Sequence, residues 1–160
     1  MQYNAVASNP FAVLTAIVAP AILTNASSVL ALGTSNRLGR VVDRTRVVAA
    51  ELSKLPKDSP ERPGWMAQLD HLQVRAQQLL TALRMFYAAL GLFAASALVS
   101  IGGSVAAYYG LKFAFELTAA LAILTGVSAV VALTTGSVVM VHETQLAVRS
   151  LGEEAKLRLK

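Results

Sequence analysis

Long apolar runs alternate with charged stretches along this chain of 160 residues. Three runs, Phe11–Ser35, Met85–Leu111 and Leu117–Val141, contain no Asp, Glu, Lys, Arg or His. A helix rises about 1.5 Å per residue, so about 25 residues reach further than the ~30 Å hydrocarbon core of a bilayer. The runs are continuously apolar, whereas the strands of a membrane barrel alternate between apolar and polar residues. The pattern therefore predicts three transmembrane helices, at about 11–35, 85–109 and 117–141.

Apolar residues also recur in the charged stretches, at alternating spacings of three and four residues. This is the spacing of a coiled-coil interface. It predicts that the helices continue beyond the membrane over about 36–55, 65–84 and 142–160 and form a coiled-coil-like three-helix bundle. A helix over 36–55 that lies flat on the membrane is the alternative. The expected seams are Leu38, Val41, Thr45, Val48, Leu52 and Leu55; Leu69, Leu72, Ala76, Leu79, Leu83 and Phe86; and Val141, Thr144, Val148, Leu151 and Ala155.

Turn-forming residues separate these helices. Residues 56–64 contain three prolines and a glycine, which end one helix and start the next. A short turn is expected at Gly110–Phe113, between the second and third spans. The sequence therefore predicts an all-α membrane protein, with residues 1–160 forming a single domain.

Positive charge is concentrated on one side of the three runs. Of the fourteen Lys and Arg residues, all but Lys112 lie either between the first and second runs or after the third. Cytoplasmic loops of membrane proteins generally carry an excess of Lys and Arg. This rule places both charged regions and the C-terminus in the cytoplasm, and the N-terminus outside. This topology accounts for the net charge of +5. No aromatic interleaving or nucleic-acid-binding motif accompanies the basic residues, so a nucleic-acid partner is not expected.

Uncharged polar residues lie within the apolar runs. In the first run, Thr24, Asn25, Ser28 and Ser35 are predicted to share a helical face. Small residues let helices approach closely, and hydroxyls bond across such contacts, so this face is a candidate for helix packing. Alternatively, the face lines a polar pore when several copies assemble. The runs contain no Asp, Glu, Lys, Arg or His, which disfavours an ion-coupled transporter.

Arginines cluster where the first run ends. Arg37, Arg40 and Arg44 share a helical face, and Arg84 is expected at the same depth from the second span. Such a cluster is typical of a collar that binds anionic lipid headgroups on the cytoplasmic side. It is also compatible with a site that holds a phosphate-bearing ligand or an acidic partner through forked hydrogen bonds. Both interpretations remain open from the sequence.

The sequence contains no motif for catalysis, for a cofactor or for a metal. There is no cysteine, which excludes disulfides, thiolate catalysis and iron–sulfur clusters. We find no nucleophile–histidine–acid arrangement, no paired-carboxylate site and no phosphate-binding glycine loop. A non-enzymatic protein without a cofactor is expected.

The stretch Thr24–Arg46 resembles the signature of an uncharacterised bacterial membrane family, domain of unknown function 2721. The residues that carry the resemblance are Asn36, Arg37, Gly39, Arg40, Asp43 and Arg44. The resemblance implies a three-span protein of the bacterial inner membrane, but no activity, substrate or catalytic residue. We therefore expect a membrane scaffold or accessory protein that forms a homo-oligomer or joins a larger complex. The alternative is a small oligomeric channel whose uncharged polar pore is lined by the first span.

Overall fold

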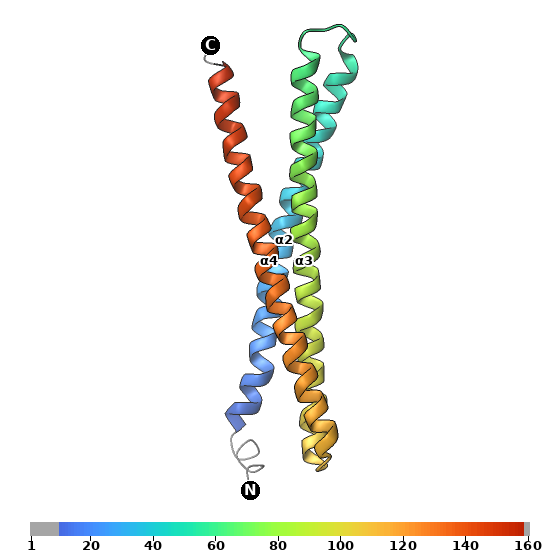
Figure 1. The fold of residues 1–160 in the computed structure, drawn as a ribbon, viewed down its shortest axis with the longest axis vertical. Helices are drawn as coiled ribbons and strands as arrows, with labels where there is room; N and C mark the ends of the chain where they lie inside the picture. The colour runs from blue at the N-terminus through green and yellow to red at the C-terminus, as the bar shows by residue number, and fades with distance from the viewer. Residues whose placement is uncertain (1–9, 159–160) are drawn as a thin grey trace. The chain divides into compact units, whose positions relative to one another are not determined.

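The computed structural model describes the backbone of residues 10–158 and the side chains of residues 18–148. This part of the chain forms three α-helices and no strand: α2 (Pro10–Lys54), α3 (Arg62–Tyr108) and α4 (Lys112–Arg158), as Figure 1 shows. Each helix is long and apolar enough to cross a membrane. The predicted all-α fold is confirmed. The predicted spans 11–35 and 117–141 lie within α2 and α4, and α3 ends at Tyr108, one residue before the predicted end of the second span.

Proline residues set the boundary between α2 and α3. Helix α2 ends at Lys54 because Leu55 precedes Pro56, and a residue before proline avoids the helical conformation. Helix α3 begins at Arg62, three residues earlier than predicted, with Pro63 in its first turn. Proline is favoured there because the first turn of a helix does not need its N–H.

The turn between α3 and α4 depends on a glycine. Gly110 has a φ of 71°, a left-handed conformation that favours glycine. The Leu111 N–H donates to the Ala106 carbonyl at 2.9 Å, and the Gly110 N–H donates to the Ala107 carbonyl at 3.1 Å. These two bonds form a Schellman motif, which satisfies the last carbonyls of α3. The turn therefore begins as predicted, although Lys112 and Phe113, which were expected within it, already belong to α4.

The described residues divide into two compact units, and every helix contributes to both. The apolar unit contains α2 up to Leu30 together with Met85–Thr134 of α3 and α4. The charged unit contains Ala31–Arg84 together with α4 from Thr135 onward. We describe each unit by itself.

Small residues bring α3 and α4 together in the apolar unit. The Ser96 hydroxyl donates to the Ala122 carbonyl at 3.0 Å. Gly103 is buried, and a Cβ built at this position would lie 2.8 Å from Thr118 Oγ1. Small residues thus permit a close helix contact. The core beside this contact consists of Ala89, Phe93 and Ala129, with Leu23, Leu92, Ala132 and Leu133 packed against them.

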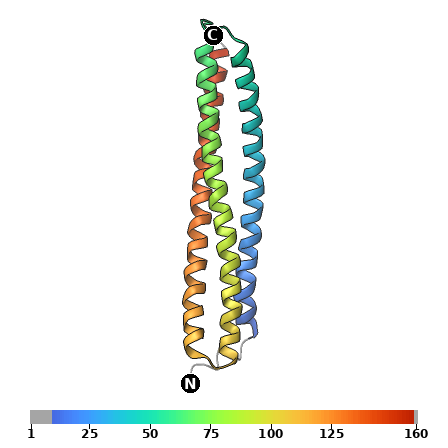
Figure 2. The same cartoon turned by 90° about the vertical axis from the view of Figure 1, so that its right-hand side faces the viewer.

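Helices α2 and α3 lie side by side in the charged unit, as Figure 2 shows. Val41 and Val48 of α2 pack with Leu72 and Leu79 of α3 in one buried cluster, and Trp65 packs against it. All twelve residues of the first two predicted seams are buried or half-buried. The helical faces predicted for these two stretches are therefore the buried ones.

The seam predicted for α4 is wrong. Val141 and Val148 are 57% and 64% exposed, and Thr144 is also exposed. Helix α4 instead presents Met140, which packs against the cluster, and Glu143, which is 2% exposed. The side chains of the remaining predicted seam residues, Leu151 and Ala155, lie outside the described part. In Figure 1 the end of α4, drawn in red, stands apart from α2 and α3.

Candidate functional site

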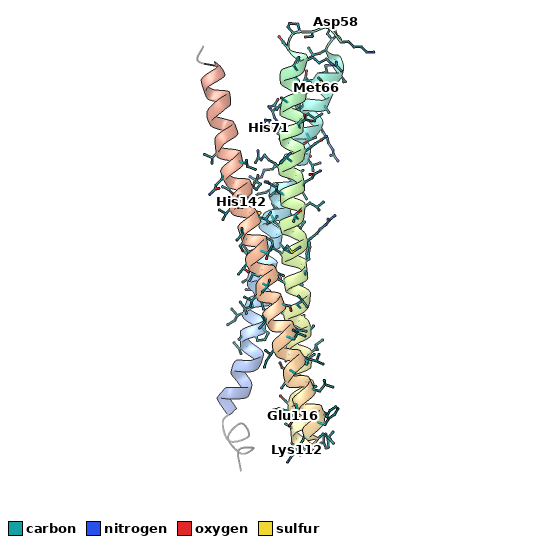
Figure 3. All side chains as sticks on the ribbon, in the orientation of Figure 1. Asp58, Met66, His71, Lys112, Glu116 and His142 are labelled. Carbon is teal, nitrogen blue, oxygen red and sulfur yellow. The ribbon has the colours of Figure 1, made fainter. Side chains whose placement is uncertain are left out.

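Charged side chains from all three helices meet at a pocket of about 390 Å³ in the charged unit. His142, labelled in Figure 3, precedes Glu143 and marks the position of this pocket along α4. We call it the arginine pocket. Its lining residues are Arg37, Arg40, Val41, Arg75, Glu143, Thr144 and Ala147.

The buried faces of α2 and α3 determine where these arginines lie. Arg37 precedes the buried Val41 by one helical turn, and Arg40 is its immediate neighbour, so both lie at the border of the buried face. Arg75 follows the buried Leu72 by three residues and borders the corresponding face of α3. The packing of α2 on α3 thus brings three guanidinium groups to one place, opposite α4.

Glu143 is held by two arginines. The Arg75 Nε group donates to Glu143 Oε1 at 3.0 Å, and Arg75 Nη2 forms an ion pair with the same oxygen at 2.9 Å. Arg37 Nη1 lies 3.8 Å from the other carboxylate oxygen and donates to the Thr144 hydroxyl at 3.2 Å. The Glu143 side chain is 3% exposed, so these contacts compensate the burial of its charge. The Thr144 hydroxyl in turn donates to the Met140 carbonyl at 2.9 Å.

Two of the four predicted arginines line this pocket. Arg37 and Arg40 do, whereas Arg44 and Arg84 are exposed and do not. Arg84 lies nine residues from Arg75 along α3, a rise of about 13 Å. The structure therefore does not bring Arg84 to this pocket, and α3 contributes Arg75 to it instead.

The roles of Arg75 and Glu143 were not predicted from the sequence. Arg75 lies within the charged stretch before the second span, and no uncharged run ends beside it, so its position alone did not indicate a role. A signal was nevertheless present. Glu143 is the first carboxylate after the third run, and the residues one helical turn before and after it, Met140 and Ala147, are apolar. A buried carboxylate requires a cationic partner, and an arginine on a facing helix satisfies that need.

The polar face predicted on the first span points mostly away from the fold. Asn25, Ser28 and Ser35 are exposed, and Thr24 is half-buried. The hydroxyls of Thr24 and Ser28 donate within α2, to the Pro20 carbonyl at 2.8 Å and the Thr24 carbonyl at 3.0 Å. Within the described part of the chain, no hydrogen bond reaches the Asn25 amide. Asn25, Ser28 and Ser35 are therefore not buried in helix packing within one copy.

Two neighbouring polar residues are buried instead. Ser27 is 0% exposed and Thr34 is 2% exposed. The Ser27 hydroxyl donates to the Leu23 carbonyl at 2.8 Å, and the Thr34 hydroxyl lies 3.6 Å from Met140 Sδ. Since residues two apart lie on opposite sides of a helix, burial of Ser27 turns Asn25 outward.

Among residues with described side chains, no group of His, Cys, Asp or Glu could hold a metal ion. A family model described as protein of unknown function (DUF2721) matches residues 17–153. The matched range includes the arginine pocket and the outward polar face of α2. No curated protein and no solved structure matches the chain.

Proposed function

Since the chain belongs to the family described as protein of unknown function (DUF2721), we propose its function from its own side chains. It is a non-enzymatic scaffold or accessory protein of the bacterial inner membrane, and it assembles into a homo-oligomer through the outward face of α2. The observation that carries this proposal is the exposed Asn25 amide in the middle of an uncharged run.

The proposed orientation places the charged unit on the cytoplasmic side and the N-terminus outside. The cation distribution supports it, since Lys112 is the sole Lys or Arg near the turn between α3 and α4. Anionic headgroups of the inner leaflet are then the nearest partners of the exposed arginines. Each cation close to such a surface contributes about 1 kcal/mol of attraction.

Assembly follows from the chemistry of the asparagine amide. This group carries two N–H donors and an acceptor oxygen. Hydrocarbon offers neither donors nor acceptors, so an unsatisfied amide there costs several kcal/mol. A second copy of the chain supplies the missing partners when two α2 helices meet through this face. Ser28, one turn from Asn25, is exposed beside it and small enough to allow close approach.

Replacement of Asn25 by leucine is expected to weaken self-association about tenfold. A hydrogen bond between membrane helices contributes about 0.6–2 kcal/mol, and 1.4 kcal/mol corresponds to a factor of ten in Kd. Energy transfer between labelled copies, measured at several protein-to-lipid ratios, reports the change.

Ser27→Ala is the matched control. It also removes a polar group from α2, but from the buried side, where the hydroxyl bonds within its own helix. Self-association should therefore remain as in the unmodified protein. The proposal is wrong if the unmodified protein is monomeric at every ratio, or if Asn25→Leu and Ser27→Ala associate equally well.

The second candidate function is a small channel with an uncharged pore. It is favoured by the exposure of Asn25, Ser28 and Ser35, which would line the pore where several α2 helices meet. Flux from liposomes distinguishes the two functions. A lining role predicts that Ser28→Leu abolishes flux while the assembly persists, because leucine fills the pore. A packing role predicts no flux from the unmodified protein and loss of assembly in Ser28→Leu.

A further inference from the structure

We propose that the arginine pocket binds a phosphate group, carried either by an anionic lipid headgroup or by a soluble phosphate compound. This site is distinct from the assembly face of α2, and the proposal goes beyond assembly. It rests on the charge, the geometry and the position of the pocket.

The pocket has an excess of positive charge. Three guanidinium groups line it, from Arg37, Arg40 and Arg75, against the single carboxylate of Glu143. Both Arg37 and Arg75 contact that carboxylate. Within the described part of the chain, no hydrogen bond or ion pair reaches Arg40. An anion in the pocket would supply the missing counter-charge.

Glu143 restrains the orientation of two arginines in the pocket before an anion binds. Its side chain is 3% exposed, accepts a hydrogen bond from Arg75 Nε and lies 2.9 Å from Arg75 Nη2, so it holds that guanidinium in one orientation. The Thr144 hydroxyl and Glu143 together restrain Arg37. Arginine carries five N–H donors in a rigid plane, so both residues retain unused donors after these bonds. Such restraint lowers the entropy that must be lost when a ligand binds.

The arrangement fits a phosphate group in shape and size. Phosphate is tetrahedral and presents oxygens in several directions, so it can accept hydrogen bonds from arginines on two different helices at once. A volume of about 390 Å³ is at the lower end of the range for small-molecule pockets, and it suits a headgroup or a small phosphate ester.

The position of the pocket favours a lipid as the source of the phosphate. Arg37 lies two residues after the first uncharged run, and Glu143 lies two residues after the third. If the runs cross the bilayer, this is the level of the headgroups. Arg40 lies one helical turn further along α2.

The test compares Arg40→Gln with Arg44→Gln. Both variants lose one positive charge from α2, but only Arg40 lines the pocket. Neither substitution removes a contact to Glu143, so thermal stability should be unchanged. Binding is measured on the full chain in a neutral detergent, by native mass spectrometry with phosphatidylglycerol and with phosphatidylcholine, and by calorimetric titration with inorganic phosphate.

We expect Arg40→Gln to weaken binding about tenfold, as for the loss of a charge-assisted hydrogen bond, and Arg44→Gln to leave it within twofold. Tighter binding of phosphatidylglycerol than of phosphatidylcholine, with this dependence on Arg40, assigns the phosphate to a lipid. The same dependence with inorganic phosphate alone assigns it to a soluble compound. The proposal is overturned if none of the three probes binds, or if the two variants weaken binding equally.

Discussion

Replacement of Arg75 by leucine is expected to lower the free energy of unfolding by about 3 kcal/mol. Glu143 then keeps a buried carboxylate whose remaining cation, Arg37, lies 3.8 Å away. Removing one partner of a buried ion pair typically costs about 3–5 kcal/mol, because the other charge stays desolvated. We place the value near the lower limit because Arg37 remains. The fluorescence of Trp65, the single tryptophan, follows unfolding of the charged unit, since this side chain packs against its core.

A second substitution tests the cause of this loss. In the double variant Arg75→Leu with Glu143→Leu, no carboxylate is left to desolvate, so most of the lost stability should return. Lys54→Leu is the control for an exposed pair. Lys54 contacts Glu51 at 2.8 Å with side chains 69% and 44% exposed, and its loss should change stability by less than about 1 kcal/mol. A double variant no more stable than Arg75→Leu would contradict the proposed role of Glu143.

Replacement of Gly103 by leucine is expected to destabilise the apolar unit by about 3 kcal/mol. A Cβ at this position already lies 2.8 Å from Thr118 Oγ1, and leucine adds three further carbons. Thr118 cannot move without disturbing hydrogen bonds to the carbonyls of Ala114 and Phe115. Overpacking a close contact typically costs about 1–3 kcal/mol, and here two helix backbones must separate. Loss of helical circular dichroism on heating in detergent measures the effect.

The adjacent glycine provides a matched control. Gly102 is exposed, and a Cβ built there meets no atom within 4 Å. Gly102→Leu should therefore preserve or slightly raise thermal stability, because leucine favours the helix by about 1 kcal/mol relative to glycine. Equal destabilisation by both substitutions would show that α3 and α4 do not approach each other at Gly103.

The packing of α2 and α3 in the charged unit could be predicted because each stretch offers one strip of large apolar residues. Val41, Val48, Leu72 and Leu79 recur at seven-residue intervals, and no other face of these helices is equally apolar. Helix α4 offers two strips one residue apart. The strip with Val141 and Val148 is the more apolar, yet the strip with Met140 and Glu143 is turned inward. With this strip turned inward, Glu143 forms an ion pair with Arg75. The spacing of apolar residues alone does not reveal such an ion pair.

The candidate site was only partly predictable for a related reason. The ends of the apolar runs suggested that Arg37 and Arg84 lie at the same depth. Pairing of α3 with α4 brings Arg75 to that level instead. The polar residues on α2 were also identified from the sequence, but the side of the helix that is buried was not. The neighbouring helices cover Ser27, so Asn25 faces outward.

The number of helices, their approximate ends and the turns between them follow from the amino-acid sequence alone. These features depend on local chemistry: proline, a glycine with positive φ, and runs long enough to cross a bilayer. The rotation of each helix about its axis and its axial register against its neighbours depend instead on how the helices pack together. Several rotations and registers bury similar apolar area, so the choice among them falls to a few specific contacts. Here these contacts are the Arg75–Glu143 pair, the close approach at Gly103 and the burial of Ser27 in place of Asn25.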